Sequence, residues 1–251
     1  MRVHRTIAEW QARRGEMDGH QIGFVPTMGA LHAGHASLVE RCRREMNIVT
    51  VSIFVNPTQF NDPSDLDRYP RTLDTDLALL ESLGVDDVIV PTASEMYAAG
   101  YSYRVENSVA PVLEAVYRPG FFTGVLTVVL KLLNLVRPAR AYFGEKDYQQ
   151  LQVVAEMARE FFLPVEIVGC PTMREASGLA MSSRNVLLSQ EGRAKAAEIH
   201  RALTTAPAPA DARNSLEAAG FVVEYVEERW GRRLAAAFLE GVRLIDNVPV
   251  H

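Results

Sequence analysis

The sequence has little cysteine, no long uninterrupted apolar run and no excess of positive charge. Two cysteines, Cys42 and Cys170, occur among 251 residues, and they lie far apart in the chain. Isolated cysteines of this kind argue against a disulfide scaffold and against a structural zinc site. They are typical of reduced thiols in a reducing compartment.

Membrane and nucleic-acid functions find little support in the sequence. The most apolar stretch, 125–136, is broken by Lys131 and Asn134 and falls short of the ~20 residues that span a bilayer. The N-terminal residues lead into polar sequence, which is not the apolar core of a signal peptide. The net charge of −5 is a weak basis for binding nucleic-acid phosphates. We therefore expect a cytoplasmic protein with no nucleic-acid or membrane partner.

What the sequence does contain is an alternation of apolar strand and helix patterns. Hydrophobic residues make up 48% and charged residues 23%, which excludes a disordered chain. Predicted strands span 22–26, 48–55, 88–91, 141–143 and 165–168. Predicted helices end near 45 and span 73–83, 112–136 with an interruption at Pro119-Gly120, and 147–161. The alternation predicts an α/β fold, a Rossmann-like parallel sheet with helices on both faces. Such sheets bind ligands at the carboxyl ends of their strands.

A second, smaller domain is predicted where the pattern changes near residue 188. One helix over 189–205 precedes a Pro/Ala connector over 204–210. A short helix and short strands at 221–227, 234–239 and 243–246 follow. We therefore divide the chain into domains 1–185 and 186–251, the second a small α+β domain that docks on the first.

The motif with the sharpest chemical meaning is H-x-G-H, His32 to His35, placed after the first predicted strand and at a helix start. A helix N-terminus offers backbone N–H groups and a positive dipole end to a phosphate. Gly34 lets a phosphate approach closely, and the two imidazoles share one side of the first turn. They can donate hydrogen bonds to charge that develops on an attacked phosphate. The plainer alternative is two polar residues at a helix start.

Three further polar segments follow other predicted strands, and each is ambiguous alone. Lys146 is placed to meet a phosphate, and Asp147 to cap a helix or hold a ribose hydroxyl. Gln150 lies one helical turn after Lys146. Each segment could also be an ordinary solvated turn. Their occurrence after successive strands of one sheet is the stronger signal.

Two of these segments offer other polar groups. Ser182, Ser183 and Arg184 together form a compact clamp for an oxyanion. Asn56 and Gln59 carry amides at a strand end, which suit hydroxyls and a carboxylate. The alternatives are a loop with capping serines and a turn stopped by Asn-Pro.

These residues resemble the pantoate–β-alanine ligase family, within the wider group of H-x-G-H nucleotidyltransferases. The matching segments appear in the family's order and are PTMGALHAGH, VSIFVNPTQF, DLDRYPRTLDTD, LTVVLKLLNLV, FGEKDYQQL, GLAMSSRN and RLIDN. The resemblance implies an AMP-forming carbon–nitrogen ligase. Pantoate and ATP would form pantoyl adenylate and pyrophosphate, and the β-alanine amine would then release AMP and give pantothenate. It also implies Mg²⁺ with the ATP and a homodimer.

The resemblance also assigns roles to individual residues. His32 and His35 would contact the phosphates, with His35 as proton donor, and Gln59 and Gln150 would bind pantoate. Asn56 is the third predicted substrate-binding residue. Asp76 matches a metal-linked aspartate. The implied catalytic residues are His32, His35, Lys146, Ser182, Ser183 and Arg184. The implied ATP site contains Pro26, Thr27, Met28, Gly29, Ala30, Leu31, His32, Ala33, Gly34, His35, Gly144, Glu145, Lys146, Asp147, Met173, Met181, Ser182, Ser183 and Arg184.

Two departures from the family pattern leave alternatives open. Phe121 and Thr123 stand where the family usually has a histidine and an arginine, and the C-terminal region looks short. A binding-competent but catalytically impaired relative is therefore a second hypothesis, and another H-x-G-H nucleotidylyltransferase is a third. The amides Gln59 and Gln150, without a further basic cluster, argue against the third. The acidic charge balance argues against a tRNA synthetase fragment.

Overall fold

The computed structural model describes residues 1–17, 19–99, 101–108 and 111–250. The chain forms two compact units, each considered by itself below. The first contains Met1–Gly144 and Gln149–Cys170, and the second contains Glu145–Tyr148 and the chain from Pro171 onward. The division into domains 1–185 and 186–251 stays a prediction. Apart from the short segment Glu145–Tyr148, the chain passes from the first unit to the second between Cys170 and Pro171.

The first unit is built on a six-stranded sheet in which all pairs are parallel. Its strands are β1 (Arg2–His4), β2 (Ile22–Thr27), β3 (Ile48–Ile53), β4 (Asp87–Ile89), β5 (Arg140–Gly144) and β6 (Glu166–Cys170). They are ordered β1-β4-β3-β2-β5-β6. This sheet confirms the predicted α/β class.

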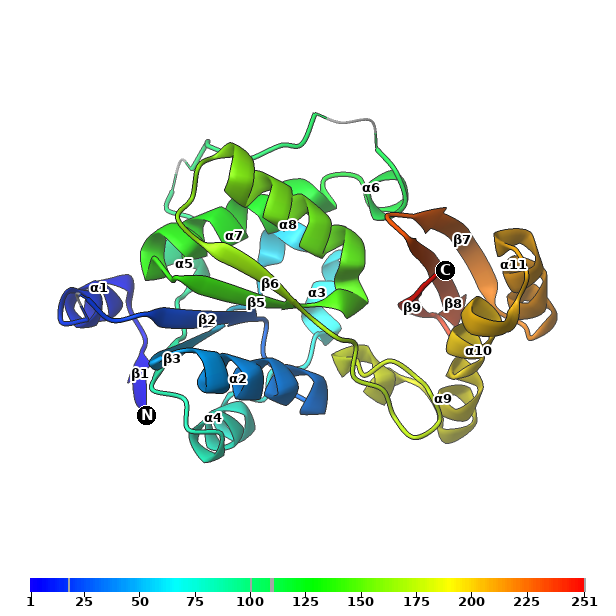
Figure 1. Ribbon diagram of the computed structural model, residues 1–251, viewed down its shortest axis with the longest axis horizontal. Helices are drawn as coiled ribbons and strands as arrows, with labels where there is room; N and C mark the ends of the chain where they lie inside the picture. The colour runs from blue at the N-terminus through cyan, green and yellow to red at the C-terminus, as the bar shows by residue number, and fades with distance from the viewer. Residues whose placement is uncertain (18, 100, 109–110, 251) are drawn as a thin grey trace. The chain divides into compact units, whose positions relative to one another are not determined.

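Helices cover both faces of this sheet. The longer ones are α1 (Ile7–Gly15), α2 (Ala33–Glu45), α4 (Leu73–Ser82), α7 (Phe121–Val136) and α8 (Tyr148–Glu160), and the short ones are η1 (Pro57–Gln59), α3 (Pro63–Arg68), α5 (Ala93–Met96) and α6 (Glu114–Tyr117). Helices α2 and α4 lie on one face, and α7 and α8 on the other (Figure 1). Within the described chain, no helix is long and apolar enough to cross a membrane.

The strand order fixes where a ligand site is expected. From β2 the chain proceeds to β3 and β4, and it then returns to the other side of β2 to form β5. The direction of winding therefore reverses between β2 and β5. In doubly wound folds, ligands bind outside the carboxyl ends of the strands at this reversal.

Burial explains why the central strands could be predicted and why one edge strand could not. Val49 and Val51 of β3 are fully buried, as expected of a strand covered on both faces. Strand β1 was missed, because it has three residues and alternates Arg2, Val3 and His4. Its pairing with β4 at the sheet edge creates it. The predicted interruption of the helix over 112–136 is confirmed between α6 and α7.

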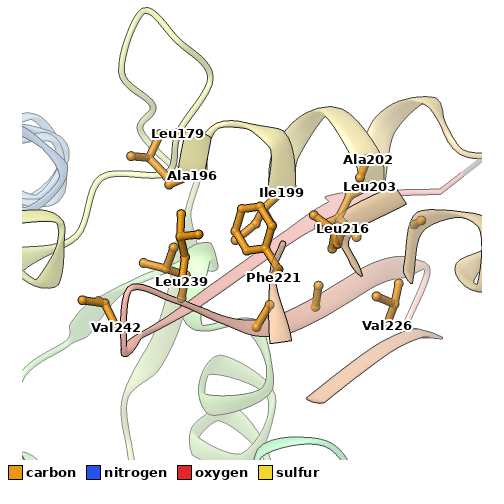
Figure 2. Close-up of a cluster of buried hydrophobic side chains, with 14 of the residues drawn as sticks. Leu179, Ala196, Ile199, Ala202, Leu203, Leu216, Phe221, Val226, Leu239 and Val242 are labelled. Carbon is orange, nitrogen blue, oxygen red and sulfur yellow. The ribbon is translucent and has the colours of Figure 1, made fainter. Parts of the chain in front are cut away.

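The second unit contains a three-stranded antiparallel sheet and several helices. Its elements are η2 (Glu145–Asp147), η3 (Ser183–Leu187), α9 (Gln190–Ala196), α10 (Glu198–Thr205), α11 (Pro209–Ala218), β7 (Val222–Arg229), β8 (Arg232–Leu239) and β9 (Val242–Pro249). The helices and the sheet enclose a hydrophobic cluster in which Phe221 lies beside Ile199 and Leu216 (Figure 2). The small C-terminal α+β fold is confirmed.

The structure corrects three local predictions in this unit. The single helix expected over 189–205 is divided at Ala197, whose N–H bonds to the carbonyl of Lys195 and leaves the α-helical pattern. The Pro/Ala connector ends earlier than expected, because Pro209 opens α11, where proline needs no N–H partner. The strands are longer than expected. The hairpin turns Trp230-Gly231 and Glu240-Gly241 have positive φ at both residues, which suits two-residue hairpins.

Candidate active site

The loop that joins β2 to α2 is held by a buried carboxylate. The Ala30 N–H donates to Oδ2 of Asp76 at 2.9 Å, and the Leu31 N–H donates to Oδ1 at 2.8 Å. The Thr72 hydroxyl also donates to Oδ1, at 3.2 Å. Asp76 is 2% exposed. Asp76 thus anchors the loop that leads into the H-x-G-H motif.

The two histidines of the motif form a capping box at the start of α2. The Gly34 N–H donates to Nδ1 of His32 at 3.1 Å, and the His32 N–H donates to Nδ1 of His35 at 3.3 Å. The spacing of three residues places the second side chain over the N-cap N–H. Because both Nδ1 atoms accept, a neutral imidazole in either position carries its proton on Nε2. Both rings therefore present an Nε2–H donor.

This arrangement limits the backbone N–H groups that the start of α2 can offer to an anion. The sequence predicts that backbone N–H groups here receive a phosphate. In the structure, the N–H groups of Ala30, Leu31, His32 and Gly34 donate to side chains of the protein itself, namely those of Asp76, His35 and His32. The two imidazole rings of the motif lie side by side, with centroids 4.1 Å apart.

Asn56, at the carboxyl end of β3, is the centre of a buried amide network. Its Nδ2 donates to Oε1 of Gln59 at 2.9 Å and to the Gly124 carbonyl at 3.2 Å. Its Oδ1 accepts from the Tyr97 hydroxyl at 2.7 Å and from the hydroxyl and N–H of Thr58. Asn56 is 1% exposed. These contacts occupy its hydrogen-bonding capacity, and one of them holds the side chain of Gln59.

Phe121, one of the two residues that differ from the family pattern, packs against an arginine beside Gln59. The Arg118 guanidinium lies over the Phe121 ring, 3.6 Å from its centroid. Arg118 also donates to the backbone carbonyl of Gln59 at 3.2 Å and faces Glu114 at 3.6 Å. A cation therefore remains next to Gln59 although the family's histidine and arginine are absent.

Two adjacent glutamines at the start of α8 have different surroundings. Gln149 is buried, and its amide bonds to the Glu114 N–H and the Val112 carbonyl. Gln150, the predicted pantoate ligand, is half-buried. The sequence did not point to Gln149, and its contacts are those of a residue that holds the segment before α6.

In the second unit, the predicted phosphate lysine lies in the short turn η2. The carbonyls of Glu145 and Lys146 both accept from Nδ2 of Asn247, each at 2.9 Å. Arg232 donates to the Glu145 carboxylate at 3.1 Å. The Lys146 ammonium lies 3.9 Å from Asp147, a long ion pair. No sequence pattern assigned a role to Asn247, although it belongs to the RLIDN segment.

The Ser-Ser-Arg segment belongs to the same unit. Ser182 caps η3 by accepting from the Arg184 N–H at 3.3 Å, and the Met181 N–H donates to the carbonyl of Met173. Buried Asn185 donates to the Ala180 carbonyl and the Glu175 carboxylate. Met173 is 42% exposed, so its side chain is accessible, as expected of a residue predicted to contact the adenine ring. Asn185 and Glu175 are supporting residues that the sequence did not identify.

The carboxylates do not form a preformed metal cage in the described part of the chain. No group of three or more histidine, cysteine, aspartate or glutamate side chains there is placed to hold a metal ion. Magnesium in nucleotide sites needs only one or two carboxylates, because phosphates and water supply the other ligands. The metal role of Asp76 stays a prediction.

The fold and these polar segments define a nucleotide-binding α/β protein. Comparison with known proteins identifies the family within this class. The family model for pantoate–β-alanine ligase matches residues 2–249. The chain belongs to the pantoate–β-alanine ligase family, whose members are enzymes that join pantoate to β-alanine.

Individual relatives match along the whole chain. Pantothenate synthetase from Bdellovibrio bacteriovorus is 51% identical over 249 residues, with 99% of each chain covered. That from Legionella pneumophila is 49% identical, covering 98% of this chain and 99% of its own. Pantothenate synthetase from Thermus thermophilus has a TM-score of 0.93 at 45% identity, with 100% of both chains covered. Pantoate–β-alanine ligase from Francisella tularensis, complexed with beta-gamma ATP and β-alanine, has a TM-score of 0.95 at 40% identity, covering 99% of this chain and 97% of its own.

These comparisons correct the expectation of a short C-terminal region. The chain and these relatives cover nearly all of each other. The C-terminal unit is therefore not shortened relative to them. One of the two reasons for considering an impaired relative is thereby removed.

Proposed function

We propose that the chain catalyses the ATP-dependent condensation of pantoate with β-alanine through a pantoyl-adenylate intermediate. In the first step a pantoate carboxylate oxygen bonds to the α-phosphorus of ATP, and the bond to pyrophosphate breaks. In the second step the β-alanine amine bonds to the acyl carbon, loses a proton, and AMP leaves. The observation that carries the proposal is the His32–His35 capping box, in which both Nδ1 atoms accept backbone N–H groups and leave Nε2 of each neutral ring as the donor.

The chemistry asks for charge neutralisation more than for a base. A carboxylate is ionised at pH 7 and is already a nucleophile. Negative charge grows on the phosphate oxygens during the attack, and placed donors stabilise it. We assign this stabilisation to His32 and His35, to the ammonium of Lys146, and to Ser182, Ser183 and Arg184. His35 would donate to the departing pyrophosphate.

Substrate binding is assigned to groups around these donors. Gln59 and Gln150 would bind pantoate through their amides, and Gln59 would also contact β-alanine. Asn56 would act through Gln59, because its own amide is occupied. The remaining residues of the proposed ATP site are Pro26, Thr27, Met28, Gly29, Ala30, Leu31, Ala33, Gly34, Gly144, Glu145, Asp147, Met173 and Met181.

The proposal includes Mg²⁺, which would reach the site with ATP and neutralise phosphate charge. Asp76 is the carboxylate implied for it. Its two oxygens already accept three hydrogen bonds out of about four that a carboxylate accepts. We therefore expect phosphate oxygens and water to supply most of the metal's ligands.

We also propose a cytoplasmic homodimer. The two cysteines are buried thiols outside any disulfide, which suits a reducing compartment. Light scattering during gel filtration measures the molar mass directly. A mass of a single chain at micromolar concentration would contradict the dimer.

The deciding experiment measures AMP and pyrophosphate from ATP with pantoate and β-alanine, added separately and together. We expect AMP release that depends on both acids, and pantoate-dependent exchange of labelled pyrophosphate into ATP without β-alanine. ATP binding without turnover in any mixture would instead favour an impaired relative. Restoring histidine at position 121 and arginine at position 123 would then test the cause.

A further inference from the structure

A fully buried asparagine in the last strand holds the turn that carries Lys146. Asn247 is 1% exposed. Its two amide hydrogens point to the Glu145 and Lys146 carbonyls, each at 2.9 Å, and its Oδ1 accepts from Nε of Arg232 at 2.5 Å. Both polar atoms of the Asn247 carboxamide therefore have partners, since Nδ2 donates twice and Oδ1 accepts once.

The position of Asn247 on the sheet makes its burial informative. Successive residues of a strand point to opposite faces. Leu244 and Val248 of β9 belong to the hydrophobic cluster under the helices, so Asn247 lies on the other face of the strand. It is buried there because the turn η2 covers it.

The chemistry of the contact requires a carboxamide. The Glu145 and Lys146 carbonyls are adjacent acceptors, and two N–H groups on one nitrogen can donate to both. The NH₂ group of asparagine supplies both. Arg232 completes the support, since it donates to the Glu145 carboxylate at 3.1 Å and lies 4.6 Å from the Tyr148 ring centroid.

The neighbouring residue of β9 holds the second predicted phosphate segment of this unit. Asp246 accepts two hydrogen bonds from Arg174, at 2.6 and 2.9 Å. Arg174 also donates to the Gly178 carbonyl at 3.1 Å and so closes the loop that runs into Ser182 and Arg184. Asp246 and Asn247 therefore support both segments from opposite faces of one strand.

We propose that Asn247 is a positioning residue that fixes the backbone at Lys146, so that the ammonium of Lys146 meets the ATP phosphates. This inference rests on the proposed function, in which Lys146 binds phosphate. Misplacing a catalytic group by about 1 Å costs ~10²-fold in rate. We expect Asn247→Ala to lower kcat/KM for ATP by about that factor while KM for pantoate stays within about twofold.

A double-mutant cycle with Lys146→Ala distinguishes positioning from general stability. If Asn247 acts through Lys146, the double variant is no slower than Lys146→Ala alone in pantoate-dependent pyrophosphate exchange. Independent effects would multiply, and the double variant would lose a further factor of about 10². That multiplicative result would overturn the proposal, as would an Asn247→Ala variant with unchanged kcat/KM for ATP.

Asn247→Asp gives a second route if the alanine variant fails to fold. It keeps the shape and the acceptor for Arg232 but turns an oxygen toward the two carbonyls. We expect the same selective loss with ATP. A uniform drop in kcat with unchanged KM values, as from a smaller folded fraction, would count against positioning.

The matched control is Arg233→Met on the adjacent strand. Arg233 is similarly buried and donates to the carbonyls of Leu203, Ala206 and Pro207, away from η2. We expect it to lower Tm and leave KM for ATP unchanged. Calorimetric ATP affinity, measured for all variants, separates a test of the proposed reaction from a test of the role of Asn247. A wild-type enzyme that binds ATP without turnover would contradict the proposed function, and the cycle measured on Kd would still decide the role of Asn247.

Discussion

Gly29 and Asp76 are fitted to each other. A Cβ atom at position 29 would lie 3.0 Å from Oδ2 of Asp76 and 3.1 Å from Cγ2 of Ile53. Gly29 also has a φ of +80°, and Ala30 follows with a φ of +50°. The left-handed backbone turns the N–H groups of Ala30 and Leu31 toward the carboxylate, and the absence of a side chain at Gly29 lets the carboxylate approach.

Gly29→Ala therefore tests the loop anchor. We expect it to lower the free energy of unfolding by about 1–3 kcal/mol, from backbone strain and from displacement of Asp76. We also expect weaker ATP binding. Gly84→Ala is the control, because Gly84 has a similar φ of +72° with open space around its missing side chain. Urea unfolding of both variants measures the difference. Equal losses of unfolding free energy in the two variants would show that a side chain at position 29 does not displace Asp76.

The capping box lets structure and chemistry be separated at His35. His35→Ala removes the acceptor for the His32 N–H and should cost about 1 kcal/mol of stability. His35→Gln restores the residue usual at this position of a capping box, so we expect it to keep stability. Both should lower kcat by about 10²-fold, the scale of a lost oxyanion donor. Near wild-type turnover in His35→Gln would remove the imidazole from the chemistry.

The amide network predicts that Asn56 affects pantoate without touching it. Asn56→Ala leaves Gln59 Oε1 and the Gly124 carbonyl without a buried donor, so stability should fall by about 1–3 kcal/mol. KM for pantoate should rise about tenfold or more, since one tenfold corresponds to ~1.4 kcal/mol. Tyr97→Phe is the milder control, because Thr58 still donates to Oδ1 of Asn56. Steady-state kinetics with pantoate varied checks both. An unchanged KM in Asn56→Ala would contradict the orienting role.

The parts that could be predicted are those written into local sequence. Buried strands such as β3 carry runs of β-branched residues, and the H-x-G-H spacing matches the two positions of a capping box. Contacts between distant residues leave no such pattern. No residue near Ala30 indicates that Asp76 accepts its N–H, and no residue near Lys146 indicates that Asn247 donates to its carbonyl. The break at Ala197 was equally hidden, because alanine favours helix and only the backbone bond to Lys195 reveals the interruption.

Cys42 predicts a loss of stability at alkaline pH. Burial raises the pKa of its thiol to about 12, above the ~8.5 of an unfolded cysteine. The corresponding stability is complete below about pH 8.5 and is lost as the pH rises toward 12. The slope approaches about 1.4 kcal/mol per pH unit. Urea unfolding of the wild type and Cys42→Ala at pH 8, 9 and 10 should show their difference shrinking. Tyr142, whose pKa is also raised mainly by burial, titrates in both. A constant difference would show that Cys42 ionises normally.

The support of Lys146 by Asn247 also sets an order of events during synthesis. The two hydrogen bonds join residues 102 and 101 positions apart. A chain leaving the ribosome folds its N-terminal parts first. The six-stranded sheet and the H-x-G-H turn are therefore made while the strand that supports Lys146 is still untranslated. A nascent chain stopped before β9 would carry Lys146 without the two hydrogen bonds that Asn247 supplies to its turn.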